Sequence, residues 1–228
     1  MARKPFKKVQ TVSDVRLVVS RWRNSGETIA LVPTMGAIHE GHLSLISKAQ
    51  NMCSRVVASL FVNPTQFGEN EDFQTYPMNE TVDTKILRGA GVDLLFLPSA
   101  DEIYPKGFST SITVSSLTNE LCGAHRPGHF SGVATVVAKL LLQILPDAAI
   151  FGEKDYQQLM VIRQMVRDLD IRSEIVGVAT KREKDGLALS SRNLYLTVKE
   201  RIIAPKLYRV LCAVAELALK QPTNLKKI

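Results

Sequence analysis

The stretch "ALVPTMGAIHEGHLSLI", residues 30–46, decides the fold. Its first part is an apolar run that ends at a proline, as a buried strand does, and its last part has the apolar spacing of a helix. Two histidines, His39 and His42, stand where the strand gives way to the helix, and Gly36 and Gly41 lie beside them. The first turn of a helix presents unpaired N–H groups and a partial positive charge, which attract anions. The stretch therefore predicts a strand–helix unit with a site for an anionic ligand at its turn.

The alternation of strand and helix continues along the chain. Strands are predicted over residues 28–32, 55–62, 92–99, 110–117, 148–152 and 173–180, and helices over residues 11–24, 41–52, 79–90, 130–145, 155–169 and 200–219. Strands that alternate with helices form a mostly parallel sheet that is covered on both faces. We therefore expect an α/β fold, a Rossmann-like parallel sheet with helices on both faces.

Polar segments follow four of these strands, at residues 33–42, 63–67, 152–158 and 181–193. In parallel sheets, ligands bind beyond the carboxyl ends of the strands. We therefore expect the four segments to meet at one edge of the sheet. The loop at residues 63–77, "NPTQFGENEDFQTYP", is rich in Pro, Gly and Asn and is long enough to act as a flap.

Composition narrows the class of protein. The chain has 228 residues, 45% of them hydrophobic, which suits one large α/β domain with or without a smaller piece. No apolar run reaches the roughly 18 residues of a membrane span, and no apolar segment follows the basic N-terminus as in a secretory signal. The net charge of +7 suits a nucleotide, but the basic residues are scattered rather than arranged for nucleic acid. We expect a cytoplasmic protein that binds neither membrane nor nucleic acid.

The two histidines have alternative explanations. A zinc site needs a third ligand, and a metalloprotease helix would read HExxH, whereas this helix start reads His39-Glu40-Gly41-His42. The cysteines, Cys53, Cys122 and Cys212, have no zinc-binding spacing and are expected to be free thiols in a reducing compartment. A purely structural role is the second alternative. The third is phosphate chemistry, in which imidazoles donate hydrogen bonds to phosphate oxygens as charge develops.

A second motif favours phosphate chemistry. The HxGH pattern after the first strand and "LALSSRN" at residues 187–193, after the last strand, together resemble the nucleotidyltransferase superfamily that includes class I aminoacyl-tRNA synthetases. That resemblance implies ATP binding and transfer of AMP to a carboxylate or a phosphate.

Longer motifs resemble one family within it. "PTMGAIHEGH", "FVNPTQFG", "RPGHFSGVATVVAKL", "FGEKDYQQL" and "DGLALSSRN" occur in the order typical of the pantothenate synthetase (pantoate–β-alanine ligase) family, across residues 8–215. The resemblance implies ATP-dependent condensation of pantoate with β-alanine through a pantoyl adenylate, with release of AMP and pyrophosphate. It also implies ATP and Mg²⁺ as cofactors and a homodimer.

The resemblance assigns roles by position. It implies ATP contacts for Met35, His39, His42, Gly152, Lys154, Asp155, Lys181, Ser190, Ser191 and Arg192, and catalytic roles for His39, His42, Lys154 and Arg192. It implies pantoate contacts for Met35, Asn63, Gln66 and Gln158, magnesium coordination for Asp83, and positioning roles for Arg126 and His129.

Family members continue through a small antiparallel sheet. We therefore expect residues 1–180 to form a nucleotide- and pantoate-binding Rossmann-like domain, and residues 181–228 to form part of a C-terminal lid domain. Two alternatives stay open. One is another HxGH nucleotidyltransferase with a phosphate acceptor, which has no reason to keep Gln66 and Gln158 as a pair. The other is a catalytically weak ATP-binding module that lacks its lid.

Overall fold

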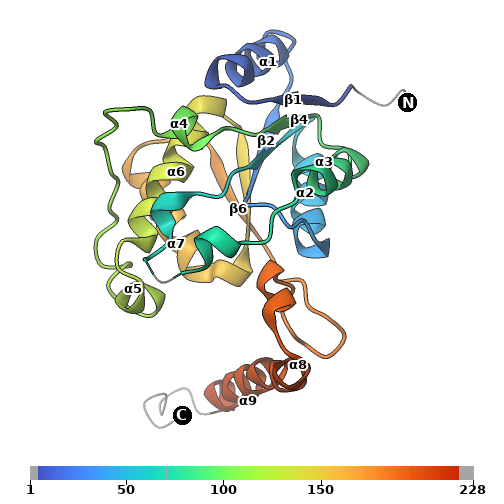
Figure 1. Cartoon of the computed structure of the whole chain (residues 1–228), viewed down its shortest axis with the longest axis vertical. Helices are drawn as coiled ribbons and strands as arrows, with labels where there is room; N and C mark the ends of the chain where they lie inside the picture. Colours follow the sequence, from blue (N-terminus) through green and yellow to red (C-terminus); the bar gives the residue numbers. More distant parts are fainter. Residues whose placement is uncertain (1–4, 70, 221–228) are drawn as a thin grey trace.

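The computed structural model describes residues 5–69 and 71–220 (Figure 1). Within these residues, six strands form one sheet in the order β1-β4-β3-β2-β5-β6. Their bounds are β1 (Lys7–Val9), β2 (Ile29–Thr34), β3 (Arg55–Leu60), β4 (Leu94–Phe96), β5 (Ala148–Gly152) and β6 (Glu174–Val178). Every neighbouring pair is parallel. The predicted parallel α/β fold is confirmed.

Helices cover both faces of the sheet (Figure 1). Their bounds are α1 (Val12–Asn24), α2 (Glu40–Met52), α3 (Glu80–Gly89), α4 (Ala100–Ile103), α5 (Cys122–His125), α6 (His129–Ile144), α7 (Tyr156–Asp168), α8 (Val198–Ile203) and α9 (Lys206–Lys220). Short 3₁₀ turns are η1 (Pro64–Gln66), η2 (Asp72–Thr75), η3 (Glu153–Asp155) and η4 (Ser191–Tyr195). No helix among the described residues is long and apolar enough to span a bilayer.

Strand β2 shows why the sheet is buried on both faces. Ile29 and Leu31 belong to the core cluster shared with α1, α6 and α7, whereas Ala30 and Val32 belong to the cluster shared with α2 and α3. Successive side chains of a strand point to opposite faces, so a strand between two helical layers must be apolar at every position. The uninterrupted apolar run in the sequence has this cause.

The strand order creates a switch point. From β2 the chain proceeds through β3 to β4 in one direction along the sheet, and β5 and β6 lie on the other side of β2. A crevice opens at the carboxyl ends where the direction reverses, and ligands of open α/β sheets bind there. The loops after β2 and β5 therefore flank the expected binding site.

Two predicted elements differ from the structure, and one strand was not predicted. The strand predicted over residues 110–117 is wrong: this segment is irregular, and the Ile112 N–H donates to Thr135 Oγ1 of α6 at 2.9 Å instead of to a strand. The helix predicted over residues 200–219 is interrupted between α8 and α9, where Pro205 has no N–H to continue it. Strand β1, three residues long, was not predicted.

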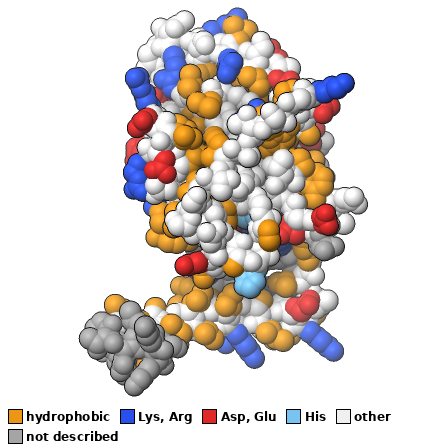
Figure 2. Space-filling model, turned by 90° about the vertical axis from the view of Figure 1, so that its left-hand side faces the viewer, with side chains coloured by type: hydrophobic (Ala, Val, Ile, Leu, Met, Phe, Trp, Pro, Cys, Tyr) orange, Lys and Arg blue, Asp and Glu red, His pale blue; other side chains and the backbone are white. Residues whose placement is uncertain are grey.

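Residues 181–220 leave the sheet and end in α8 and α9 (Figure 1). Arg201 of α8 pairs with Glu183 at 2.5 Å and Asp185 at 2.6 Å, and the Arg182 guanidinium lies 3.7 Å from the Tyr208 ring centre. The apolar side chains of α9 remain largely exposed, and Figure 2 shows hydrophobic side chains along this lower part of the molecule.

Candidate active site

The two histidines cap the helix that they begin. His39 is the N-cap of α2, and its Nδ1 accepts the Gly41 N–H at 3.1 Å. His42 Nδ1 accepts the His39 N–H at 3.2 Å, so the two rings form a reciprocal capping box. A nitrogen that accepts cannot carry the proton of a neutral imidazole. Both rings therefore carry their proton on Nε2, the nitrogen left for a ligand.

Both imidazoles are neutral at physiological pH. Burial lowers the pKa of His42 to about 3, helped by the nearby His39 and Lys154. Burial, followed by the charge of Lys154, also lowers the pKa of His39. The ring centres lie 4.1 Å apart, too close for two imidazolium ions in a buried place. Each histidine therefore offers one N–H donor rather than a full positive charge.

The positive charge comes from the other side of the switch point. Strand β5 pairs directly with β2, and Gly152 at its end is followed by Lys154 and Asp155 in η3. Lys154 Nζ contacts Asp155 Oδ1 at 3.2 Å, and both side chains are partly exposed to the pocket and solvent. Gln158 stands in the first turn of α7. The histidine pair follows β2 and the lysine follows β5. Because these strands are adjacent, the three side chains lie at one crevice.

Asn63 orients Gln66, for which the family resemblance implies a pantoate contact. Its side chain is 1% exposed, and Nδ2 donates to Gln66 Oε1 and to the Gly132 carbonyl, both at 3.1 Å. The Tyr104 hydroxyl donates to Asn63 Oδ1 at 2.7 Å. Gln66 Nε2 lies 3.2 Å from the sulfur of Met35. These contacts fix the Gln66 amide between the loops that follow β2 and β3.

A second network anchors the same loop to α6. His129 Nδ1 donates to the Gln66 carbonyl at 2.8 Å, and Arg126 Nη1 donates to His129 Nε2 at 3.1 Å. Arg126 also holds Glu71 through two bonds of 2.6 and 2.5 Å. This ion pair lowers the pKa of Glu71, while burial lowers the pKa of His129. Arg126 thus contacts the flap, which we define by its described residues 68–69 and 71–77, and His129 contacts the backbone of the loop that follows β3.

The serine–arginine loop, residues 187–193, contacts the turn between β2 and α2 that carries the histidines. Ser190 Oγ caps η4 by accepting the Arg192 N–H at 3.3 Å, and Ser191 Oγ donates to the Ala37 carbonyl at 3.2 Å. Ser191 is 8% exposed. Arg192 extends toward the flap and pairs with Asp72. The loop therefore lies against both sides of the pocket.

These segments enclose one pocket of about 240 Å³ at the carboxyl edge of the sheet. Its lining includes Met35, His39, His42, Asn63, Gln66, Arg126, His129, Gly152, Lys154, Asp155, Gln158, Lys181, Ser190, Ser191 and Arg192. The exception among the predicted site residues is Asp83. It is 2% exposed and its oxygens accept the N–H groups of Ala37 and Ile38, an arrangement that does not fit the magnesium ligand expected from the sequence.

The pocket also has members that the sequence analysis missed. An apolar wall is formed by Pro33, Phe61, Val133, Val137, Leu140 and Phe151. Tyr76 of the flap contributes a ring whose hydroxyl pKa is raised by burial. The apolar run of α6 was a signal for burial, but a pattern of core residues does not tell which of them border a cavity.

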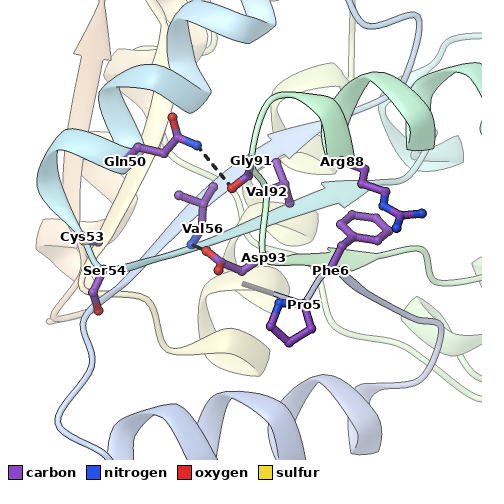
Figure 3. Close-up of a pocket in the computed structure, with 10 residues that line it drawn as sticks. All are labelled: Pro5, Phe6, Gln50, Cys53, Ser54, Val56, Arg88, Gly91, Val92 and Asp93. Atoms are coloured by element: carbon purple, nitrogen blue, oxygen red, sulfur yellow. Dashed lines mark hydrogen bonds between the residues drawn. The ribbon is translucent and has the colours of Figure 1, made fainter. Parts of the chain in front are cut away.

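A second cavity, of about 470 Å³, lies at the opposite, amino edge of the sheet (Figure 3). It is larger, but its polar side chains serve the fold: the Asp93 oxygens accept from Arg55 at 3.0 Å and the Val56 N–H at 2.8 Å. Gln50 Nε2 donates to the carbonyls of Ala90 and Gly91. The pocket at the carboxyl edge is therefore the candidate active site.

Neutral histidines that donate through Nε2, facing a lysine across a switch point, suit stabilisation of negative charge on a transferring phosphate. Fold and site thus define the class: an α/β nucleotidyltransferase of the HxGH type. The sequence model of the family described as pantoate-beta-alanine ligase matches residues 7–228. The chain belongs to the pantoate-beta-alanine ligase family.

Individual relatives in sequence and in structure support this family membership. A pantothenate synthetase from Paramagnetospirillum magneticum is 58% identical over 208 residues, which are 91% of this chain and 73% of the relative. The crystal structure of pantothenate synthetase from Thermus thermophilus matches with a TM-score of 0.90 at 52% identity, over 94% of this chain and 76% of that one. Pantoate-beta-alanine ligase from Francisella tularensis, complexed with beta-gamma ATP and beta-alanine, matches with a TM-score of 0.84 at 44% identity, over 90% and 79%.

Proposed function

We propose that this chain condenses pantoate with β-alanine to pantothenate with ATP, through a pantoyl adenylate, and releases AMP and pyrophosphate. The observation that carries the proposal is the convergence of the predicted ATP- and pantoate-binding residues, from four separate segments, on one pocket. Family membership favours this reaction over that of another HxGH nucleotidyltransferase with a phosphate acceptor.

In the first step the pantoate carboxylate attacks the α-phosphorus of ATP. The new bond joins a carboxylate oxygen to that phosphorus, and the bond to the β-phosphate oxygen breaks to release pyrophosphate. We assign the Nε2–H donors of His39 and His42 and the ammonium of Lys154 to the phosphate oxygens, where negative charge grows. A carboxylate is already nucleophilic at pH 7, so the protein mainly has to position it.

The remaining residues hold the substrates. We assign Gln66 and Gln158 to pantoate, with Asn63 orienting Gln66 and the Met35 N–H close to the carboxylate. On the nucleotide, we assign Gly152 and Asp155 to the ribose hydroxyls and the Lys181 backbone to adenine, since all three line the pocket. Ser190, Ser191 and Arg192 are assigned to the terminal phosphates. We also propose that residues 181–228 belong to a lid over the nucleotide.

In the second step the amine of β-alanine attacks the acyl carbon. A carbon–nitrogen bond forms, the acyl–oxygen bond to AMP breaks, and the amine proton passes to solvent or a pocket base. The mixed anhydride must be kept from water until then, and the flap, tied to Arg126 and Arg192 by ion pairs, is placed to shield it.

Magnesium is a separate part of the proposal. The described residues contain no group of three or more His, Cys, Asp or Glu side chains suited to hold an ion, and Asp83 is turned to the backbone. Mg²⁺ is commonly carried by substrate phosphates and water. The described part of the chain therefore supplies no dedicated site for the ion. A homodimer and a cytoplasmic location are proposed on the family resemblance alone.

The test is an assay of the 228-residue chain with ATP and pantoate, with and without β-alanine. We expect pantothenate and stoichiometric AMP only when all three substrates are present. AMP formation with a phosphate acceptor in place of pantoate would support a different transferase. ATP binding without turnover would support the weak ATP-binding module.

A further inference from the structure

The turn between β2 and α2 has an unusual backbone. Gly36 and Ala37 both have positive φ, +99° and +50°. Glycine adopts this region freely, whereas alanine does so at a cost that surrounding contacts must offset. The turn immediately precedes Ile38 and His39, so its shape fixes where the first histidine begins α2.

One carboxylate holds this turn. Asp83 Oδ2 accepts the Ala37 N–H at 3.0 Å and Asp83 Oδ1 accepts the Ile38 N–H at 2.8 Å. The Asn79 N–H adds a longer bond of 3.4 Å to Oδ2. A Cβ on Gly36 would lie 3.0 Å from Asp83 Oδ2, so the backbone is packed directly on the carboxylate. Asp83 is in the first turn of α3, where a negative charge is favourable.

The turn also contacts the serine–arginine loop. The Ala37 carbonyl accepts the Ser191 hydroxyl at 3.2 Å, so the N–H and the carbonyl of Ala37 are both engaged. A shift of this residue would therefore displace the histidine pair and the serine–arginine loop together. Positional errors of about 1 Å are enough to slow a positioned reaction about 100-fold.

We infer that Asp83 is a positioning residue for the adenylation step: by accepting the N–H groups of Ala37 and Ile38, it locks the turn that places His39 and Ser191. This inference rests on the proposed function. Asp83 is not a catalytic residue, because it is 2% exposed and stands behind the pocket lining rather than in it.

The test begins with Asp83→Asn, which keeps the shape of the side chain but replaces one acceptor oxygen with a donor. We expect the turnover number for pyrophosphate release to fall about 100-fold. The KM for pantoate should change by less than about threefold, because two of its assigned contacts, Gln66 and Gln158, stand on other elements and only Met35 adjoins the turn. The matched control is Asp93→Asn, which removes a carboxylate that is 7% exposed and accepts the Val56 N–H at 2.8 Å, at the opposite edge of the sheet. It should lower stability and leave turnover within about twofold.

A second substitution separates positioning from metal binding. Glycine tolerates positive φ, so Ala37→Gly added to Asp83→Asn should recover about tenfold of the lost turnover, with the magnesium requirement unchanged. A magnesium ligand could not be restored in this way, and its loss would raise the Mg²⁺ concentration needed. No recovery together with a raised magnesium requirement would overturn the inference, as would a loss of turnover no larger than that of the control.

Amide hydrogen exchange on the unaltered, metal-free protein gives an independent test if Asp83→Asn does not fold. The Ala37 and Ile38 amides should exchange as slowly as those of β2, although they lie in a turn. Exchange at the rate of open loops would contradict the inference. This measurement needs no turnover, so it remains decisive even if the chain makes no pantothenate.

Discussion

Arg192 and Asp72, 120 positions apart in the sequence, form a two-bond ion pair in which both nitrogen–oxygen distances are 2.8 Å. The arginine belongs to the serine–arginine loop and the aspartate to the flap. The hydrogen bonds from Arg192 lower the pKa of Asp72, so the carboxylate stays ionised well into acid. The Tyr195 hydroxyl donates to the Thr75 carbonyl at 3.0 Å beside the pair. An aspartate therefore holds the arginine that we assign to phosphate.

Asp72→Asn should lower the KM for ATP by up to about fivefold, because the carboxylate no longer competes with phosphate for the guanidinium. The ceiling is set by a partly exposed pair being worth at most about 1 kcal/mol. Steady-state kinetics at fixed pantoate measure the change, with Arg192→Lys as the comparison, which should raise the KM. An unchanged or raised KM for Asp72→Asn would mean that Asp72 does not compete.

With ATP and pantoate but no β-alanine, the protein should release one pyrophosphate per site and then stall. The flap should shield the adenylate from water, and Tyr195→Phe, which removes one tether of the flap, should raise the slow hydrolysis several-fold. Tyr208→Phe, far from the flap against Arg182, is the matched control. Rapid-quench measurement of pyrophosphate and AMP decides; continuous AMP release by the unaltered protein would contradict shielding.

His42→Gln should reduce the loss of the free energy of unfolding that occurs as the pH falls. His42 has a pKa of about 3 in the folded protein and about 6.5 when unfolded, so below pH 6.5 only the unfolded chain gains the proton. The contribution of neutral His42 to the free energy of unfolding is complete above pH 6.5. It declines toward pH 3 by roughly 1.4 kcal/mol per pH unit. Gln at this position can retain the capping box.

Urea unfolding of both proteins between pH 7 and pH 4 measures this difference. The effect of Asp72 and Glu71, whose depressed pKa values also favour the folded state above acid pH, is common to both proteins and cancels. Parallel stability curves would show that His42 titrates normally.

The exposed face of α9 should drive association of the chain. Leu207, Val210 and Leu211 are 69%, 57% and 53% exposed, a helical spacing that gathers them on one side. Leu211→Gln should weaken association about tenfold, the effect of withdrawing roughly 1.5 kcal/mol of apolar burial. Arg209→Gln should not. Sedimentation velocity over a range of concentrations provides the measurement, and concentration-independent behaviour of the unaltered chain would rule the idea out.

Much of the candidate site could be predicted from the positions in the sequence at which the strands end. Parallel strands put their carboxyl ends on one edge, so placing His39 after one strand and Lys154 after another was enough to bring them together. The reason why β5 lies directly beside β2, with β3 on its other side, depends on tertiary packing that local patterns do not encode. The placement of the histidines and the lysine in one pocket was therefore expected, but not the switch point that creates this pocket.

The hydrogen-bond and ion-pair partners of individual side chains were harder to predict from the sequence. Asp83 was assigned to magnesium by the family resemblance, and only its burial and the two N–H groups that donate to it point to a different role. Glu71 and Asp72 gave no signal at all, because surface carboxylates in a loop acquire meaning only from the arginines that reach them. The strand predicted at residues 110–117 failed for a related reason: alternating residues also suit a segment that borrows a side-chain acceptor, Thr135 Oγ1.

The imidazoles of His39 and His42 divide their two nitrogens between folding and chemistry. Nδ1 of each ring closes the start of α2, and Nε2 faces the pocket. Few side chains have two nitrogen atoms, one accepting and one donating, at different edges of one rigid ring. Asparagine could close the helix start but would not extend to the phosphate, and lysine could extend but has no acceptor for the cap. Substitution at these two positions is thus restricted by two requirements, the helix cap and the donor that faces the pocket. Histidine is the residue that meets both requirements.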